Sequence, residues 1–472
     1  MELKSKYNLI ILGSGAAGIN AAIQASKLNK KVCIVEKSLS NIGGNWIHWG
    51  TMPSKTLRES LEAIQSIRSH MGNLWVDRVI DDLRTDKLFK RAEKVCREEQ
   101  DLVRRYLKSN NIEIIEGFAV IESEYQVRVL PRKNKPFLIE TDFILLATGS
   151  KPNRPSNIPF DGWRVIDSDD ITQFRNVPKT IVICGAGATG CEYACIFAAL
   201  GSKVTIVDKN ERILNFSDHE VCLELQNSME AMGIDFYLGS EFKGITFKGP
   251  RVFSHFKELI LQSDIFYYAA GRQASTQNLG LEKLGIQTTE RGAVVVNDFF
   301  QTHVPNIYAA GDIIGPPALA ATSFQQGRYV SCHAFGVDVE EYIKFYPIGV
   351  YTIPEMSMVG KTEEQLRKEK KSYVVGRAYY YEIARGYIRG DSHGLIKILV
   401  CSETHRLLGI HIAGADACNL IHIGMTLMVK NAPVQDLVHM VFNHPTLAEG
   451  FRIAGFNALN KIFPDGFFTK KP

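Results

Sequence analysis

The sequence predicts an α/β protein with two domains built on parallel sheets, followed by a third, α+β domain. Three observations predict this class. A glycine-rich loop stands between an apolar strand and a helix at two separate places in the chain. Beyond residue 346, strand-like and helix-like segments follow one another in a different order. The 472 residues also exceed the size at which single hydrophobic cores stop growing, so two or three domains are expected.

The first glycine loop follows an apolar strand at residues 8–12 and opens a helix that we expect to reach residue 28. The next strand, residues 31–35, ends at Glu36. The loop glycines are Gly13, Gly15 and Gly18. Glycines let a pyrophosphate approach the backbone, the helix N-terminus supplies amide donors, and the acid accepts from a ribose hydroxyl. The alternative is a turn that only packs a helix on a strand. Strand, helix and acid together favour a Rossmann-like dinucleotide site.

The second glycine loop repeats this arrangement. A strand at residues 180–184 precedes it, a helix at 191–200 follows it, and a strand at 203–207 ends at Asp208. The loop glycines are Gly185, Gly187 and Gly190. In both copies the acid lies 18 residues after the third glycine. Two matched copies are more specific than one, and they predict two dinucleotides, one in each domain.

Asp208 bears on which nucleotide the second domain prefers. An acid at this strand end binds the adenosine ribose diol of NAD and repels a 2′-phosphate. Lys209 and Arg212 lie close by in the sequence and would soften that repulsion. We therefore expect NAD(H) to be preferred, with NADP(H) as the alternative.

The other elements follow from periodicity and turn residues. A charged amphipathic helix is expected at 81–110, and a buried strand at 143–150 ends in a turn at Gly149. Prolines at 151–159 indicate a linker. Further strands are expected at 112–121, 126–130 and 265–272, and a helix at 319–330.

The third domain begins near residue 346. Strands of a mixed sheet are expected at 351–355, 397–400 and 407–413, and helices at 417–430 and 434–441. The resulting domain assignment is 1–150 and 273–345 for the first dinucleotide domain, 151–272 for the second, and 346–472 for the last.

Composition excludes several classes of function. The net charge of +4, from 55 basic and 51 acidic residues, is too balanced for a nucleic-acid or membrane partner. The N-terminus lacks the layout of a secretory signal, and no apolar run reads as a membrane span, so we expect a cytoplasmic protein. No metal-ligand cluster stands out, which predicts no metal site.

The nine cysteines are scattered without a Cys-x-x-Cys pair, as in a reducing compartment. Cys191 and Cys195 stand four residues apart on an expected helix and so share a face. They are either a relocated redox pair or two small core residues. We interpret them as core residues.

The stretch from Gly43 to Lys55 reads Gly-Gly-Asn-Trp-Ile-His-Trp-Gly-Thr-Met-Pro-Ser-Lys. It resembles the redox-loop helix of the FAD-dependent pyridine nucleotide-disulfide oxidoreductases, in which two cysteines face the flavin. Trp46 and Thr51 hold those positions here, so the chain lacks both redox cysteines. Neither indole nor a threonine hydroxyl can form a disulfide. The run from His48 to Thr51 is similar to the soluble pyridine nucleotide transhydrogenases within this family.

The resemblance implies FAD and a nicotinamide nucleotide as cofactors, and a homodimer or larger homo-oligomer. It places Lys55 beside the flavin, paired with a glutamate at position 192, Glu192. The run 143–150, with Gly149, resembles the Ala-Thr-Gly motif of the family, where the chain leaves the first nucleotide domain. The run 306–312 resembles the second flavin motif of the family, in which Asp312 would hydrogen-bond the ribityl chain. Gly271 ends the strand that leaves the second domain.

Near the C-terminus, His444 and Glu449 resemble the family segment that reaches the flavin of the partner subunit. Without a dithiol, this pair would either protonate a quinone oxygen or remain an interface hydrogen bond. Both readings stay open, since a histidine titrates near neutral pH in either role. The transhydrogenases usually have tyrosine where this chain has His444, and cysteine where it has Trp46. Trp46 would cover the flavin face that a disulfide substrate uses.

These expectations lead to three hypotheses. The first is an FAD enzyme that relays a hydride from NAD(P)H to a second pyridine nucleotide without a redox disulfide, since the flavin alone carries that chemistry. The second is an NAD(P)H:quinone or dye reductase. The third is a flavin-binding sensor or structural protein with negligible turnover, which the intact Lys55, Glu192 and second glycine loop disfavour.

Overall fold

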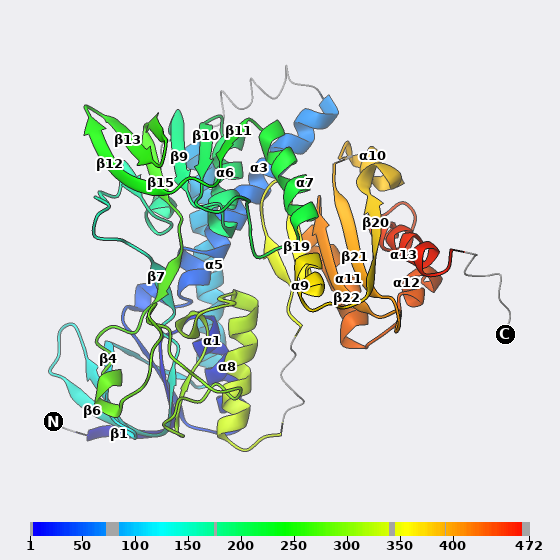
Figure 1. Cartoon of the computed structure of the whole chain (residues 1–472). Coiled ribbons are helices and arrows are strands. Elements are labelled where there is room, and N and C mark those ends of the chain that lie inside the picture. Colours follow the sequence, from blue (N-terminus) through cyan, green and yellow to red (C-terminus); the bar gives the residue numbers. More distant parts are fainter. Residues whose placement is uncertain (1–2, 72–84, 174–176, 339–344, 392, 465–472) are drawn as a thin grey trace, which may run out of the picture.

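The computed structural model describes residues 3–71, 85–173, 177–338, 345–391 and 393–464. Its strands form three main sheets, and we call the parts built on them the first, second and third units. Strand β1, which begins at Leu3, and helix α13, which ends at Ile462, lie at opposite sides of the molecule (Figure 1). The predicted α/β class, with two Rossmann-like units and a C-terminal α+β unit, is confirmed.

The first unit has a sheet in the order β3-β2-β1-β6-β5-β4, with β17 pairing to β6. Strands β3, β2, β1, β6 and β17 run parallel, whereas β5 pairs antiparallel with both β6 and β4. Because β17 comes from beyond the second unit, the chain leaves this sheet and returns to it. The strands are β1 (Leu3–Leu12), β2 (Val32–Glu36), β3 (Glu113–Glu116), β4 (Phe118–Ser123), β5 (Gln126–Leu130), β6 (Phe137–Leu146) and β17 (Ile307–Ala309).

Helices pack closely on the first sheet and form the middle of the molecule (Figure 1). A Cβ at Gly327 of α8 would lie 2.0 Å from the carbonyl oxygen of Ala17 in α1, so these two helices touch backbone to backbone. The predicted helix 81–110 is α5, and the part of that prediction at 81–84 lies outside the described residues. The helices are α1 (Ala16–Lys27), α2 (Asn45–His48), α3 (Thr51–Met71), α5 (Thr85–Ser109) and α8 (Ala320–Ala334).

The second unit has a parallel sheet in the order β11-β10-β9-β15-β8, with helices α6 and α7 and an antiparallel sheet β12-β13-β14. Two short antiparallel strands, β7 and β16, lie where the chain enters and leaves this unit. The bounds are β7 (Ser150–Pro152), β8 (Val165–Ile166), β9 (Thr180–Cys184), α6 (Ala188–Ala199), β10 (Lys203–Val207), α7 (His219–Ala231), β11 (Ile234–Tyr237), β12 (Phe242–Lys248), β13 (Arg251–Phe256), β14 (Leu259–Ser263), β15 (Ile265–Tyr268) and β16 (Arg272–Ala274).

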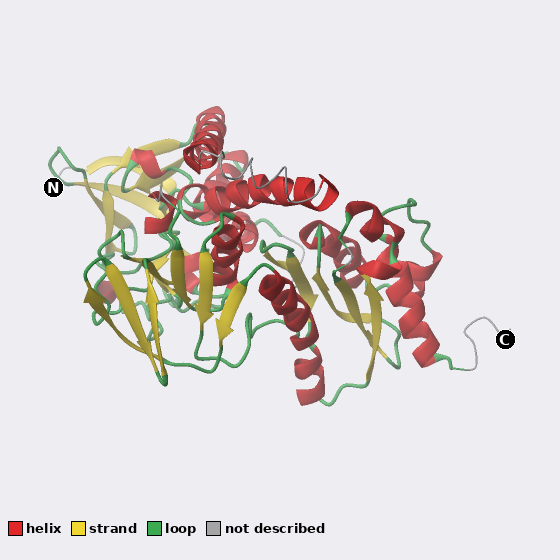
Figure 2. Ribbon diagram, turned by 90° about the horizontal axis from the view of Figure 1, so that it is seen from above, coloured by secondary structure: helices red, strands yellow, loops and turns green. Residues whose placement is uncertain are grey.

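The third unit has a sheet in the order β18-β19-β22-β21-β20, with helices on both faces (Figure 2). All its pairs are antiparallel, so the prediction of a mixed sheet is wrong. Short connections such as the one between β21 and β22 permit only antiparallel pairing. The bounds are β18 (Ile348–Val350), β19 (Met356–Gly360), α9 (Glu363–Lys368), β20 (Tyr373–Tyr379), α10 (Ala384–Arg389), β21 (Leu395–Cys401), β22 (Leu407–Ala413), α11 (Ala417–Val429), α12 (Gln435–His439) and α13 (Glu449–Ile462).

The strand predicted at residues 351–355 is also wrong, because this segment is the loop between β18 and β19. Its backbone groups bond to side chains of other units instead of to a neighbouring strand. The Tyr351 amide donates to Glu192 at 2.9 Å, and the Thr352 carbonyl accepts from Arg58 at 3.2 Å. Pro354 has no N–H to give to a ladder. The domain boundaries remain a prediction.

No helix in the described ranges is long and apolar enough to cross a lipid bilayer.

Candidate functional site

The two glycine loops share one spatial pattern. A Cβ at Gly18 would lie 2.1 Å from the carbonyl oxygen of Gly13, and one at Gly190 would lie 1.9 Å from that of Gly185. The third glycine of each loop is therefore required by the fold. A Cβ at Gly187 would meet nothing within 4 Å, and one at Gly15 only the Ala147 carbonyl oxygen at 4.0 Å.

Open space at the middle glycine, in front of a helix N-terminus, is the cradle that a pyrophosphate needs. The residues at both loops thus fit a dinucleotide. Gly13 and Gly185 have φ of +104° and +121°, which only glycine adopts without strain.

The two predicted acids lie at equivalent places in their loops. Glu36 accepts from the Ser14 amide at 2.9 Å and from the Ser14 hydroxyl at 2.7 Å. Asp208 accepts from the Ala186 amide at 2.6 Å and from the Asn210 amide at 2.7 Å. Each carboxylate is held at the mouth of its cradle, where a ribose diol would meet it.

The Arg212 guanidinium is hydrogen-bonded to groups away from Asp208. It donates to Glu364 of the third unit at 2.7 Å and to the Asn215 carbonyl at 3.1 Å. Its guanidinium is therefore not held ready for a 2′-phosphate beside Asp208.

Lys55 and Glu192 meet, as the resemblance implied. The Lys55 ammonium lies 2.7 Å from one Glu192 carboxylate oxygen and 2.9 Å from the other. Lys55 is on α3 of the first unit and Glu192 is on α6 of the second, so this ion pair joins two units. Glu192 is buried, while Lys55 keeps part of its surface open.

Tyr351 of the third unit completes this group. Its backbone amide donates to Glu192 at 2.9 Å, and its ring lies under the Lys55 ammonium, 4.9 Å from nitrogen to ring centroid. Sequence reasoning singled out residues 351–355 as a run but missed this contact, because the partners stand far apart in the chain.

A series of hydrogen bonds joins the segment after Gly149 to Asp312 of the predicted flavin motif. The Ser150 hydroxyl donates to Asp312 at 2.7 Å and accepts from Arg272 at 2.9 Å. Gly149 and Gly271, with φ of +71° and +106°, are the turns just before Ser150 and Arg272. Asp312, Gly149 and Gly271 are thus brought to one place at the junction of the first two units.

Trp46 and Thr51 stand at the ends of α2 and α3. The Trp46 ring packs edge-on against Phe324, with centroids 5.4 Å apart, and its buried indole N–H finds no hydrogen-bond partner among the described residues. All nine cysteines, which fall in the described residues, are free. Burial raises the pKa of Cys195 to about 12 and that of Cys191 well above its usual value, which favours inert core thiols.

His444 and Glu449 also meet, with the imidazole Nδ1 3.0 Å from a carboxylate oxygen. Burial opposes ionisation of Glu449, but hydrogen bonds from His444 and the Thr446 amide lower its pKa overall. The His444 side chain is 68% exposed. Glu449 is the first residue of α13, and His444 stands in the segment between α12 and α13. These two helices lie across the third sheet from α3 (Figure 1).

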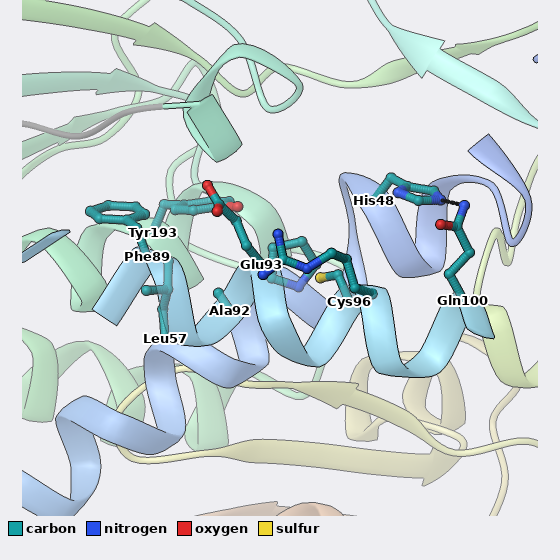
Figure 3. A pocket seen from close by; sticks show the side chains of 10 residues that line it. His48, Leu57, Phe89, Ala92, Glu93, Cys96, Gln100 and Tyr193 are labelled. Carbon is teal, nitrogen blue, oxygen red and sulfur yellow. Dashed lines mark hydrogen bonds between the residues drawn. The ribbon is translucent and has the colours of Figure 1, made fainter. Parts of the chain in front are cut away.

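A cavity of about 260 Å³ lies between α3, α5 and α6, next to the redox-loop segment (Figure 3). Leu57, Phe89 and Ala92 form its apolar wall, and Gln100 contacts the His48 ring at 3.3 Å. Burial lowers the pKa of His48, which favours the neutral ring. Sequence reasoning did not find this cavity, whose walls come from three separate helices.

Residues 7–327 match the family model described as pyridine nucleotide-disulphide oxidoreductase, and residues 346–454 match the dimerisation domain of the same family. The chain belongs to the pyridine nucleotide-disulphide oxidoreductase family. As a member it is an FAD-dependent oxidoreductase that uses pyridine nucleotides, so both cofactor predictions are confirmed. The dimerisation domain agrees with the expected homo-oligomer.

Relatives and solved structures agree with this placement. The soluble pyridine nucleotide transhydrogenase of Mycobacterium bovis (strain BCG / Pasteur 1173P2) is 39% identical over 459 residues, which are 97% of this chain and 98% of the relative. The protein of the same name from Marinomonas sp. (strain MWYL1) is 36% identical over 464 residues, 97% and 99% of the two chains.

The Cu(II) complex of HOCl-induced flavoprotein disulfide reductase RclA from Escherichia coli superposes with a TM-score of 0.86 at 27% identity, covering 96% of this chain and 99% of that one. LpdA from Mycobacterium tuberculosis, at 22% identity and a TM-score of 0.88, covers the same shares and has the same fold.

Proposed function

We propose that this enzyme relays a hydride from NAD(P)H through FAD to a second pyridine nucleotide, without a redox disulfide. The observation that carries the proposal is the Lys55–Glu192 pair, held at 2.7 Å between the two units that bear the glycine cradles. Bound FAD supplies the redox chemistry. Two relatives named soluble pyridine nucleotide transhydrogenase, at 39% and 36% identity, support the same choice.

The chain's own residues orient the bound dinucleotides and stabilise the negative charge that develops on reduction. The loop of Gly13, Gly15 and Gly18, with Glu36, holds the dinucleotide of the first unit. The Lys55 ammonium places a positive charge where negative charge develops on reduction, and Glu192 keeps that cation oriented. Lysine has three N–H donors and Glu192 takes two of them, which leaves one for a bound ligand.

The second loop, with Gly185, Gly187, Gly190 and Asp208, holds the nicotinamide nucleotide. We propose NAD(H) as the better substrate, because Asp208 repels a 2′-phosphate and Arg212 is engaged with Glu364. Transhydrogenation then requires that NADP(H) still bind here, with lower affinity than NAD(H), or that the hydride pass between two nucleotides of the NAD type.

The disulfide route is absent from the proposed mechanism. Trp46 and Thr51 replace the thiols, and Trp46 covers the face that a disulfide would approach. His444 and Glu449 reach the flavin of the partner subunit in the proposed homodimer, as an interface hydrogen bond or as a proton donor to an oxygen acceptor. The cytoplasm is the proposed location.

One comparison of substrates tests the proposal. The purified yellow protein is given NADH or NADPH together with a thionicotinamide dinucleotide, a quinone, lipoamide or glutathione disulfide. We expect ping-pong transfer to the thionicotinamide, faster with NADH, and no turnover of the disulfides. Strong quinone turnover with little transhydrogenation supports the dye-reductase alternative, and fast lipoamide reduction contradicts both.

A further inference from the structure

Tyr351 is the place where the third unit touches the Lys55–Glu192 pair. Three units contribute to this group: Lys55 from α3, Glu192 from α6, and Tyr351 from the loop after β18. The contact has two independent parts. The Tyr351 amide binds the carboxylate at 2.9 Å, and the Tyr351 ring faces the ammonium at 4.9 Å.

We propose that Tyr351 is a positioning residue, whose ring face holds the Lys55 ammonium in place and thereby raises the reduction potential of FAD bound against it. The inference rests on the proposed function, since it takes Lys55 as the cation beside the flavin. It adds a residue of the third unit to the redox site.

The ring is itself held in place. A Cβ at Gly349 would lie 3.4 Å from the Tyr351 ring and 2.9 Å from the Cys418 sulfur, so ring and thiol pack together over the glycine. Burial raises the pKa of Tyr351, with Cys418 and Glu355 adding to the effect. The phenol therefore stays neutral, and its π face presents partial negative charge to the cation without a competing phenolate.

The ring adds a second attractive contact to the ammonium, beside the ion pair. Glu192 accepts two hydrogen bonds from the ammonium, and the Tyr351 ring centroid lies 4.9 Å from the nitrogen. A cation–π contact is weaker where the cation is exposed than where it is desolvated. Lys55 is partly exposed, so we expect a modest effect.

The backbone and ring contributions separate by mutation, since a side-chain change at residue 351 keeps the amide bond to Glu192. The test measures the flavin midpoint potential by dye equilibration, and the rate of flavin reduction by NADH in stopped flow. Tyr351→Phe keeps the π face and should match the unaltered enzyme. Tyr351→Leu and Tyr351→Met lack it, and we expect a more negative potential and a reduction rate lowered about twofold to tenfold.

An isosteric series removes any question of folding. Phenylalanine at position 351 carrying one, two and three ring fluorines loses π-face charge stepwise without a change of shape. We expect the potential to fall with each fluorine. Flavin content and thermal midpoint, measured alongside, should stay constant across the series.

The outcomes are distinct. A potential that is unchanged in Tyr351→Leu and across the fluorinated series overturns the inference, as does a loss in Tyr351→Phe equal to that in Tyr351→Leu. If the unaltered chain binds no flavin, or its flavin is not reduced by either nicotinamide, the proposed function fails and the inference falls with it.

Discussion

At the scale of single residues, the Lys55–Glu192 pair is the feature that most constrains the chemistry. Separating a buried carboxylate from its cation leaves an uncompensated charge, which costs more than an exposed ion pair contributes. Glu192 is buried and accepts from Lys55 and the Tyr351 amide only, among the hydrogen bonds of the described residues. The pair thus stabilises the contact between the first two units, and the proposed mechanism uses its cation beside the flavin.

The first prediction compares Lys55→Met with a double substitution of this pair. Lys55→Met should lower the free energy of unfolding by about 1–3 kcal/mol, because Glu192 loses its cation. It should also slow flavin reduction by NADH at least about tenfold, since one lost charge contact costs more than 1.4 kcal/mol in the transition state. Lys55→Met with Glu192→Leu should recover part of the stability and none of the rate. Thermal unfolding and stopped-flow absorbance measure the two effects.

Lys90 is the matched control, because its ion pair with Asp86 lies on the surface of α5 at 3.2 Å. Lys90→Met should change the unfolding free energy by less than about 0.5 kcal/mol. A Lys55→Met enzyme with unchanged unfolding and unchanged reduction rate would contradict the assigned role.

At the scale of elements, the two glycine loops divide their glycines between folding and binding. The third glycine of each loop lets the helix contact the strand end, and the second leaves room in front of the helix N-terminus. Gly187 has φ of −78°, which alanine adopts freely. A substitution at the second glycine should therefore weaken nucleotide binding, and one at the third glycine should lower stability.

Gly187→Ala and Gly190→Ala form the second prediction. The first should keep the unfolding midpoint and raise the Kd for NADH by about tenfold or more, because the methyl group occupies the pyrophosphate cradle. The second should lose about 2 kcal/mol or more of stability, since its Cβ meets the Gly185 carbonyl oxygen. Calorimetry and quenching of flavin fluorescence give the two quantities. Unaltered NADH affinity in a folded Gly187→Ala enzyme would remove the loop from the nucleotide site.

Local sequence predicted the regular elements well. The strands at 180–184, 203–207 and 407–413 were predicted with the observed ends, because apolar runs between glycines and charges specify them. The segment 351–355 failed, since its backbone bonds go to Glu192 and Arg58 of other units. The same long-range contacts make Tyr351 part of the site. Hydrophobic periodicity cannot reveal a contact between residues nearly 300 positions apart, such as Lys55 and Tyr351. The spacing from the third glycine to the acid covers only 18 residues and occurs twice, so it could be recognised.

At the scale of the whole molecule, charged residues fasten the second unit to the third. Lys397 of β21 is 1% exposed and lies 2.8 Å from Asp218 and 3.0 Å from Glu220, at the start of α7. Asp218 also caps α7 and accepts from the Glu363 amide at 3.2 Å. Asp218 thus contacts the N-terminal end of a helix in each unit, α7 in the second and α9 in the third.

The third prediction concerns acid stability at this contact. Burial opposes ionisation of Glu364, but the hydrogen bond from Arg212 lowers its pKa to about 2. Because the folded-state pKa lies below the ordinary value, this carboxylate stabilises the fold fully above about pH 5, and the contribution is lost as pH falls toward 2. After allowance for partial exposure, we expect it to be worth about 1 kcal/mol.

Glu364→Gln should therefore destabilise the protein at pH 7 and flatten the fall of its thermal midpoint between pH 5 and pH 3. Glu258→Gln, at a residue whose side chain is 88% exposed in the turn between β13 and β14, should leave that profile unchanged. Identical pH profiles for Glu364→Gln and the unaltered enzyme would show that the ion pair does not link the units.

The fourth prediction concerns the face that carries His444. Val441 is 95% exposed and stands three residues before His444, in the segment between α12 and α13. This segment lies within residues 346–454, which match the dimerisation domain of the family, so we expect a second copy of the chain to cover Val441. We expect a dimer of twice the chain mass of 52.8 kDa by sedimentation. Val441→Glu should shift it toward monomer, because a carboxylate buried at an apolar contact loses its hydration.

Ile260→Glu, at an equally apolar side chain 61% exposed on β14, should leave the dimer intact. If Val441→Glu sediments as the unaltered enzyme does, this segment lies outside the dimer contact, and His444 cannot reach a partner's flavin from it.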